Sequence, residues 1–151
     1  MAHAENKVRI RRSPQDVYAF LADGMNGPLW RTGVKDIALK SGAAGTVGAV
    51  YSQTLTGPGG RSVAGDFEVI EAVPGELMRF QVVAGPARPT GEYRLRATEN
   101  GTELHFTLDL APKGMMKLMG PMIAKTMTAE VAQLEALKTV LETESPGTAR
   151  G

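Results

Sequence analysis

The sequence predicts an α+β fold in which a curved antiparallel sheet of seven strands wraps around one long C-terminal helix. Between Val34 and Pro112, short alternating segments are separated by turn residues, as in successive strands. No helical period there is long enough to connect parallel strands, so the sheet should be antiparallel. From Lys113 to about Glu142 the apolar residues recur with helical spacing instead, which predicts the single helix that covers the sheet.

One strand and two short helices precede this region. The strand is Lys7–Arg12, where apolar and basic residues alternate as in a half-buried strand. A helix should follow at once, because Ser13 is a good N-cap and Pro14 a good first helical residue. We expect this helix to end near Asp23, and a second short helical turn to carry Trp30.

The other six strands follow from alternation and from glycine-rich turns. We place them at Val34–Lys40, Ala49–Thr56, Ser62–Val73, Leu77–Ala84, Gly91–Thr98 and Thr102–Ala111. Asn100-Gly101 is the strongest turn signal, because a type I′ turn needs positive φ at both central residues. Alternation predicts an inner face that comprises Phe67, Val69, Phe80, Val82, Tyr93, Leu95, Leu104, Phe106 and Leu108.

The C-terminal helix is rich in methionine. Its apolar stripe comprises Met115, Met119, Met122, Ile123, Met127, Val131, Leu134, Leu137 and Leu141. Pro121 removes a backbone hydrogen bond, so we expect a kink there, or a separation between a first turn and the main helix. Flexible thioethers fit irregular apolar surfaces, and the methionines therefore either fill the core or line an adaptable pocket.

Composition excludes several classes of protein. The 151 residues suit one domain over residues 1–151, with an ordered core from about residue 6 to 143. The chain has no cysteine, which excludes thiolate metal sites, and we expect neither a metal site nor a cofactor. A net charge of +1 without a basic cluster argues against nucleic acid as a partner. No apolar run approaches the roughly 20 residues of a membrane span, which favours a cytoplasmic protein.

One helix cannot cover the whole apolar face of a curved sheet, since the two touch only along a line. We therefore expect a hollow between them. The residues predicted to bind a ligand there are Trp30, Tyr51, Gln53, Phe67, Phe80, Tyr93, Phe106, Met119, Met122, Ile123 and Met127. A buried polar group without a partner costs about 1–3 kcal/mol. The polar members Tyr51, Gln53 and Tyr93 should therefore bond to each other, to water or to a ligand.

The chain offers few groups for catalysis. His3 lies near the N-terminus, and His105 should face solvent because it alternates with apolar neighbours. The glycine-rich segment 42–48 lacks the lysine and the following helix of a phosphate-binding loop. If the protein is an enzyme, the catalytic candidates are Tyr51 and Tyr93, as a proton donor or electrophile toward a ketone.

Several motifs carry a resemblance to a known family. They are Ser13-Pro14-Gln15-Asp16-Val17-Tyr18-Ala19-Phe20-Leu21-Ala22, Trp30 after the second helix, Gly85-Pro86-Ala87-Arg88-Pro89-Thr90-Gly91, and Gly101-Thr102-Glu103-Leu104. With the order of elements and the final amphipathic helix, they resemble the START-like, Bet v 1-like superfamily (SRPBCC). The chain is most similar to the bacterial branch of polyketide cyclase/dehydrase and lipid transport proteins, from Asn6 to about Leu141.

The resemblance implies a helix-grip fold around an apolar cavity. It also implies a hydrophobic small molecule as the partner, such as a lipid, a polyketide or another aromatic metabolite. On this basis the chain either binds or transports that molecule, or acts as a polyketide cyclase, aromatase or dehydratase on a ligand in the same cavity. A third hypothesis is an interaction module that pairs through an exposed strand edge. We expect a monomer or a homodimer.

Overall fold

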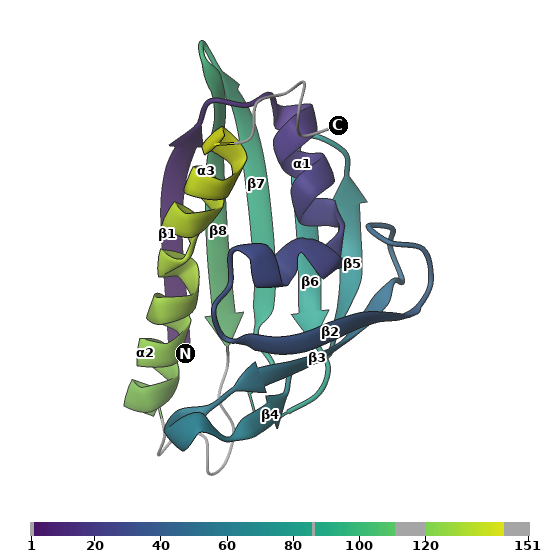
Figure 1. Cartoon of the computed structure of the whole chain (residues 1–151), viewed down its shortest axis with the longest axis vertical. Coiled ribbons are helices and arrows are strands. Elements are labelled where there is room, and N and C mark those ends of the chain that lie inside the picture. The colour runs from purple at the N-terminus through teal and green to yellow at the C-terminus, as the bar shows by residue number, and fades with distance from the viewer. Residues whose placement is uncertain (1, 86, 111–119, 144–151) are drawn as a thin grey trace.

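A bent antiparallel sheet and two consecutive C-terminal helices form the framework of the molecule (Figure 1). The computed structural model describes residues 2–85, 87–110 and 120–143. The elements are β1 (Ala2–Ile10), α1 (Pro14–Ala22), the 3-10 helix η1 (Gly24–Leu29), β2 (Val34–Ser41), β3 (Val50–Thr56), the 3-10 turn η2 (Pro58–Gly60), β4 (Ser62–Ala64), β5 (Phe67–Val73), β6 (Leu77–Val82), β7 (Thr90–Thr98), β8 (Gly101–Leu110), α2 (Gly120–Ala132) and α3 (Leu134–Thr143). The predicted α+β class is confirmed.

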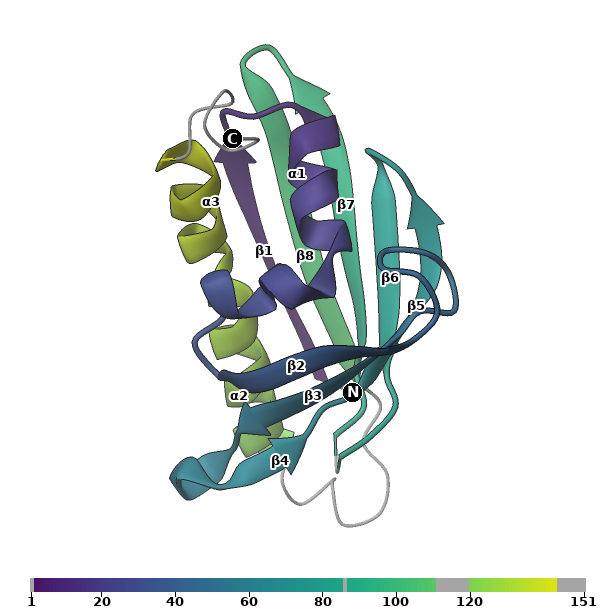
Figure 2. The ribbon, with the colours of Figure 1, turned by 45° about the vertical axis from the view of Figure 1, so that its right-hand side comes forward.

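The sheet has the order β1-β8-β7-β6-β5-β3-β2, and its neighbouring strands are antiparallel. Seven strands form this path, as predicted, while the short β4 pairs with β3 outside it. The predicted strand Ser62–Val73 is divided near Gly65 into β4 and β5. The junction between β3 and β5 is short and includes the pair Tyr51↔Phe67, and the sheet bends there (Figure 2).

The two short helices follow β1 as predicted. The Ser13 hydroxyl accepts a hydrogen bond of 3.1 Å from the Asp16 N–H and so caps α1, with Pro14 in the first turn. Asp23 caps η1 in the same way, because its carboxylate accepts from the Met25 N–H at 3.0 Å. In both views α1, η1 and the C-terminal helices lie on one side of the sheet, with α2 and α3 along β1.

The described part of the C-terminal helix is interrupted at Gln133, between α2 and α3. The kink or separated first turn that we predict at Pro121 involves residues before Gly120, which lie outside the described ranges. The Val131 carbonyl accepts a hydrogen bond of 3.1 Å from the Asn6 amide, and the Gln133 side chain accepts one of 3.0 Å from the Thr32 N–H. These contacts stabilise the interruption and fix it against β1 and the segment after η1.

The β7–β8 hairpin differs from the predicted type I′ turn. Asn100 does not have a positive φ, and Gly101 has a φ of 159° and is the first residue of β8. A Cβ atom on Gly101 would lie 2.1 Å from the carbonyl oxygen of Ile10. The close approach of β1 and a φ that other residues rarely adopt therefore both favour glycine at this position.

β1 begins earlier than predicted, at Ala2, and pairs with β8 along its whole length. His3 is consequently a strand residue, and its Nδ1 lies 2.6 Å from Asp109 Oδ1 while its Nε2 lies 3.1 Å from Glu5 Oε2. His105 Nε2 lies 2.6 Å from Glu5 Oε1. Both histidines lie on the outer face of the sheet, which confirms the predicted orientation of His105.

The densest part of the core lies where the C-terminal helices meet β1, β8 and α1. Its least exposed apolar side chains are Ile10, Val17, Leu104, Phe106, Leu134, Leu137 and Leu141. On the predicted inner face, Val69, Tyr93, Leu95, Leu104, Phe106 and Leu108 are buried. Phe67, Phe80 and Val82 remain partly exposed, because they face a cavity and not a packed helix.

The contacts of His3 predict a contribution to stability that depends on pH. Hydrogen bonds with Asp109 and Glu5 raise the pKa of His3 in the folded protein above its ordinary value of 6.5. The stabilisation is therefore complete below the unfolded pKa and is lost as the pH rises through the higher folded pKa. We expect His3→Gln to lower the melting temperature more at about pH 6 than at about pH 9, measured by circular dichroism. An equal decrease at both pH values would contradict this account.

Candidate functional site

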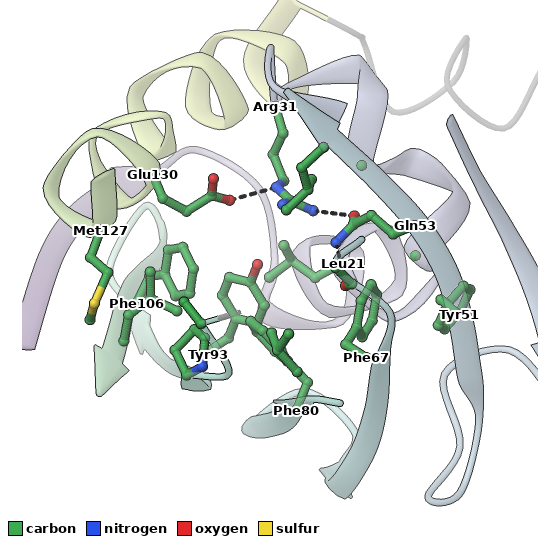
Figure 3. A pocket seen from close by; sticks show the side chains of 18 of the residues that line it. Leu21, Arg31, Tyr51, Gln53, Phe67, Phe80, Tyr93, Phe106, Met127 and Glu130 are labelled. Atoms are coloured by element: carbon green, nitrogen blue, oxygen red, sulfur yellow. Dashed lines mark hydrogen bonds and ion pairs between the residues drawn. The ribbon is translucent and has the colours of Figure 1, made fainter. Parts of the chain in front are cut away.

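A cavity of about 280 Å³ lies between the concave face of the sheet, the α1–η1 segment and α2 (Figure 3). Its wall includes residues from α1, η1, every strand from β3 to β8, and α2. The cavity follows from the helix packing: α2 and α3 contact β1, and α1 contacts β7 and β8. The concave surface of β3, β5 and β6 is left to line the cavity.

Five neighbouring strands each contribute one aromatic side chain to this wall. These residues, called the aromatic band below, are Tyr51, Phe67, Phe80, Tyr93 and Phe106. Tyr51 stacks on Phe67 with ring centroids 5.0 Å apart, and Tyr93 stacks on Phe106 at 4.5 Å. Phe80 lies between these pairs, 5.4 Å from Phe67 and 5.9 Å from Tyr93. The strand register produces the band, because the residues of each stacked pair are direct partners.

Two glycines leave space for the aromatic band. A Cβ atom on Gly91 would lie 2.1 Å from the ring of Phe80, and one on Gly24 would lie 2.8 Å from the ring of Tyr51. Trp30 is buried and meets Tyr93 edge to face, with centroids 6.5 Å apart. The rings are therefore held in place by close packing from both the sheet and η1.

One side of the cavity is polar. The residues there, called the polar end below, are Arg31, Gln53, Tyr93 and Glu130 (Figure 3). Arg31 Nε donates to Glu130 Oε2 at 2.6 Å, and Arg31 Nη1 donates to Gln53 Oε1 at 2.9 Å. Gln53 Nε2 in turn donates to the Gly65 carbonyl at 3.0 Å. The segment after η1, β3, the link between β4 and β5, and α2 thus meet in one hydrogen-bonded cluster.

Tyr93 adds a neutral hydroxyl to this cluster. Burial raises the pKa of Tyr93 well above its ordinary value of 10; the positive charge of Arg31 opposes this shift and Glu130 adds to it. The phenol therefore stays protonated at neutral pH and can donate a hydrogen bond. Its oxygen points toward the Arg31–Glu130 pair in Figure 3, and no hydrogen bond joins it to any other described residue.

The structure brings most of the predicted ligand-binding residues together. Those that line the cavity are Trp30, Tyr51, Gln53, Phe67, Phe80, Tyr93, Phe106 and Met127. Met119 lies outside the described residues, as does Met115, and so do the side chains of Met122 and Ile123.

Sequence reasoning missed Arg31 and Glu130. Glu130 comes three residues after Met127 and directly before Val131, so helical spacing places it at the border of the apolar stripe. A carboxylate at that border is a signal that could have identified it. Arg31 follows the buried Trp30 and offers no comparable pattern, because its position depends on how η1 ends against the sheet.

Within the described part of the chain, other reactive groups are not assembled in the cavity. Neither His3 nor His105 lines it. The Tyr51 hydroxyl is buried and has no hydrogen-bond partner within the described ranges. Among the described residues, no three histidine, aspartate or glutamate side chains are placed to hold a metal ion. In the same part of the chain, no helix has the length and apolar character needed to cross a membrane.

Comparison with known proteins gives one family and several similar folds. The sequence matches the family described as polyketide cyclase / dehydrase and lipid transport over residues 1–142. A START superfamily protein from Mycobacterium smegmatis has a TM-score of 0.78 at 15% identity, with 95% of this chain and 99% of that chain covered. A protein from Thermus thermophilus has a TM-score of 0.77 at 19% identity, with 95% and 99% covered.

A solution structure of the Aha1 dimer from Colwellia psychrerythraea is also similar, with a TM-score of 0.64 at 23% identity and with 94% of this chain and 97% of that chain covered. No match is found among curated proteins. At these identities the solved structures establish a shared fold. The predicted START-like, helix-grip architecture is therefore confirmed.

The position of Gln53 generates a prediction about stability. Its side chain is buried and satisfies both Arg31 and the Gly65 carbonyl. Gln53→Leu keeps the size but leaves these groups unpaired, and we expect it to lower the free energy of unfolding by about 2 kcal/mol in urea denaturation. The control is Thr54→Val on the opposite face of β3, with an expected change within about 0.5 kcal/mol. Equal effects of the two substitutions would show that the cluster does not stabilise the fold.

Proposed function

Because the chain belongs to the polyketide cyclase/dehydrase and lipid transport family of the START-like superfamily, we propose that it binds or transports a hydrophobic small molecule in the cavity. The observation that carries the proposal is the cavity itself, about 280 Å³ in volume and lined mostly by apolar side chains with the polar end at one side. Ligand sites commonly combine apolar walls with a few polar groups that fix orientation. A lipid, a polyketide or another aromatic metabolite fits this description.

The aromatic band would supply most of the affinity. Burial of roughly 200 Å² of apolar ligand surface stabilises a complex by about 5 kcal/mol before ordering costs, at about 25 cal/mol per Å². Phe67 and Phe80 present ring surface that is only partly covered by the protein. Ring faces and edges add favourable contacts with another ring system, which favours ligands that contain aromatic rings.

An unfilled cavity would be costly. At about 24 cal/mol per Å³, leaving 280 Å³ empty costs up to about 7 kcal/mol, which is comparable with the net stability of a whole domain. Water can fill the polar end, where it finds hydrogen-bond partners, but the surface of the aromatic band offers it few. A hydrophobic ligand removes this cost along the whole wall, which supports binding as the function.

Catalysis on a ligand in the same cavity is a second candidate function, as a cyclase, aromatase or dehydratase. The specific observation in its favour is the protonated Tyr93 hydroxyl beside Arg31 and Glu130. Because burial raises its pKa, Tyr93 is better suited to donate a hydrogen bond to a carbonyl oxygen that gains negative charge than to transfer its proton. Tyr51 is a poorer candidate, since its pocket neighbours are Phe67 and η1 and its hydroxyl is fully covered.

The binding proposal is tested with N-phenyl-1-naphthylamine, an uncharged fluorescent probe. We expect saturable binding to the purified protein, followed by probe fluorescence excited beyond the absorption of tryptophan. Val82→Trp places a large ring in the cavity wall and should weaken probe binding about tenfold or more, which corresponds to at least about 1.4 kcal/mol.

Val83→Trp is the matched control, because Val83 is the next residue, is 37% exposed and does not line the cavity. We expect this variant to bind the probe like the wild type. Absence of saturable binding, or equal weakening by the two tryptophan substitutions, would overturn the proposal that the cavity is the ligand site.

A further inference from the structure

We infer that the polar end selects a hydrophobic ligand that carries an uncharged oxygen, such as an alcohol, a phenol or a ketone, over one that carries a carboxylate or sulfonate, and that Glu130 sets this preference. The inference rests on the proposed function, because it concerns the ligand of the same cavity. It adds the chemical class of that ligand and a residue that determines specificity.

Arg31 alone would attract an anion into the cavity. Its guanidinium is permanently charged and lies beside apolar walls, where an unpaired charge is strongly disfavoured. Glu130 already provides the opposite charge at 2.6 Å, and the two side chains are only 14% and 25% exposed. The pair is neutral as a unit, so a second anion that enters the cavity loses its hydration and finds no free cation among the described wall residues.

The remaining charge around the cavity also disfavours an anion. Among the described residues of the wall, the charged ones are Asp23, Arg31 and Glu130. Asp23 holds the start of η1 through its hydrogen bond from the Met25 N–H. The described wall thus carries two carboxylates and one guanidinium, and this excess of negative charge disfavours a carboxylate or sulfonate.

Two hydrogen-bond donors at the polar end are available to a ligand. Nε and Nη1 of Arg31 are engaged, and Nη2 has no partner among the described residues. The Tyr93 O–H is the second such donor. A neutral oxygen has lone pairs to accept from both groups, whereas an ammonium ion has none. The polar end thus matches an uncharged acceptor at the tip of an apolar body.

Two probes with one skeleton test this inference. N-phenyl-1-naphthylamine is uncharged, and 8-anilinonaphthalene-1-sulfonate is the same ring system with a sulfonate. Any apolar cavity favours the neutral probe, so the informative quantity is the change in the ratio of the two dissociation constants. We expect Glu130→Gln to tighten binding of the sulfonate about tenfold, the order expected for one unit charge near the ligand in a partly solvated site. The ratio of the sulfonate's dissociation constant to that of the neutral probe should therefore fall in Glu130→Gln, because an uncharged probe is not repelled by the carboxylate.

Glu99→Gln is the matched control. It removes the same charge from an exposed turn between β7 and β8 and should leave both dissociation constants unchanged. If Glu130→Gln shifts the ratio no more than Glu99→Gln does, the inference is wrong even though the neutral probe binds. If the neutral probe does not bind in the cavity at all, the proposed function itself is wrong.

The reciprocal variant keeps the test decisive if Glu130→Gln does not fold. Arg31→Gln leaves Glu130 without its cation, and we expect the ratio of the sulfonate's dissociation constant to that of the neutral probe to rise about threefold or more. An unchanged ratio in Arg31→Gln would overturn the inference. Melting temperatures measured alongside identify which variants are folded.

Discussion

The limited contact between helix and sheet is the constraint on which this structure depends. α2 and α3 pack along β1, and α1 packs on β7 and β8, so the core is dense there. The sheet bends at the junction of β3 and β5 and carries β2, β3 and β4 across its concave side (Figure 2). The apolar surface of the sheet that no helix covers therefore lines a cavity. Because aromatic rings such as those of Phe67 and Phe80 are large, a few side chains are enough to form its wall.

The same bend explains where the polar groups gather. Gln53 lies on β3, next to the break between β4 and β5. Its side-chain amide donates a hydrogen bond to the Gly65 carbonyl, which this break leaves without a strand partner. Arg31 links Gln53 to Glu130 and thereby connects the bent part of the sheet to α2. Structural and proposed ligand-binding roles thus coincide at the polar end, because the cluster that closes the fold also sets the charge of the cavity.

Local patterns predicted the fold better than they predicted the site. Alternation placed Tyr93 and Phe106 on the inner face, and Ser13 identified the start of α1, because these features depend on neighbours in sequence. The interruption at Gln133 and the pairing of Arg31 with Glu130 depend on contacts between distant segments, which no local period reveals. The apolar and aromatic walls of the cavity were therefore predictable, whereas its charge balance was not.

A crystal structure of the protein with 1-naphthol bound tests the central claim most directly. The account predicts that the rings lie against Phe67 and Phe80 and that the naphthol oxygen is within hydrogen-bond distance of the Tyr93 hydroxyl, with the Arg31–Glu130 pair intact. Naphthol bound only on the outer face of the sheet, or a cavity filled by the protein's own side chains, would contradict it.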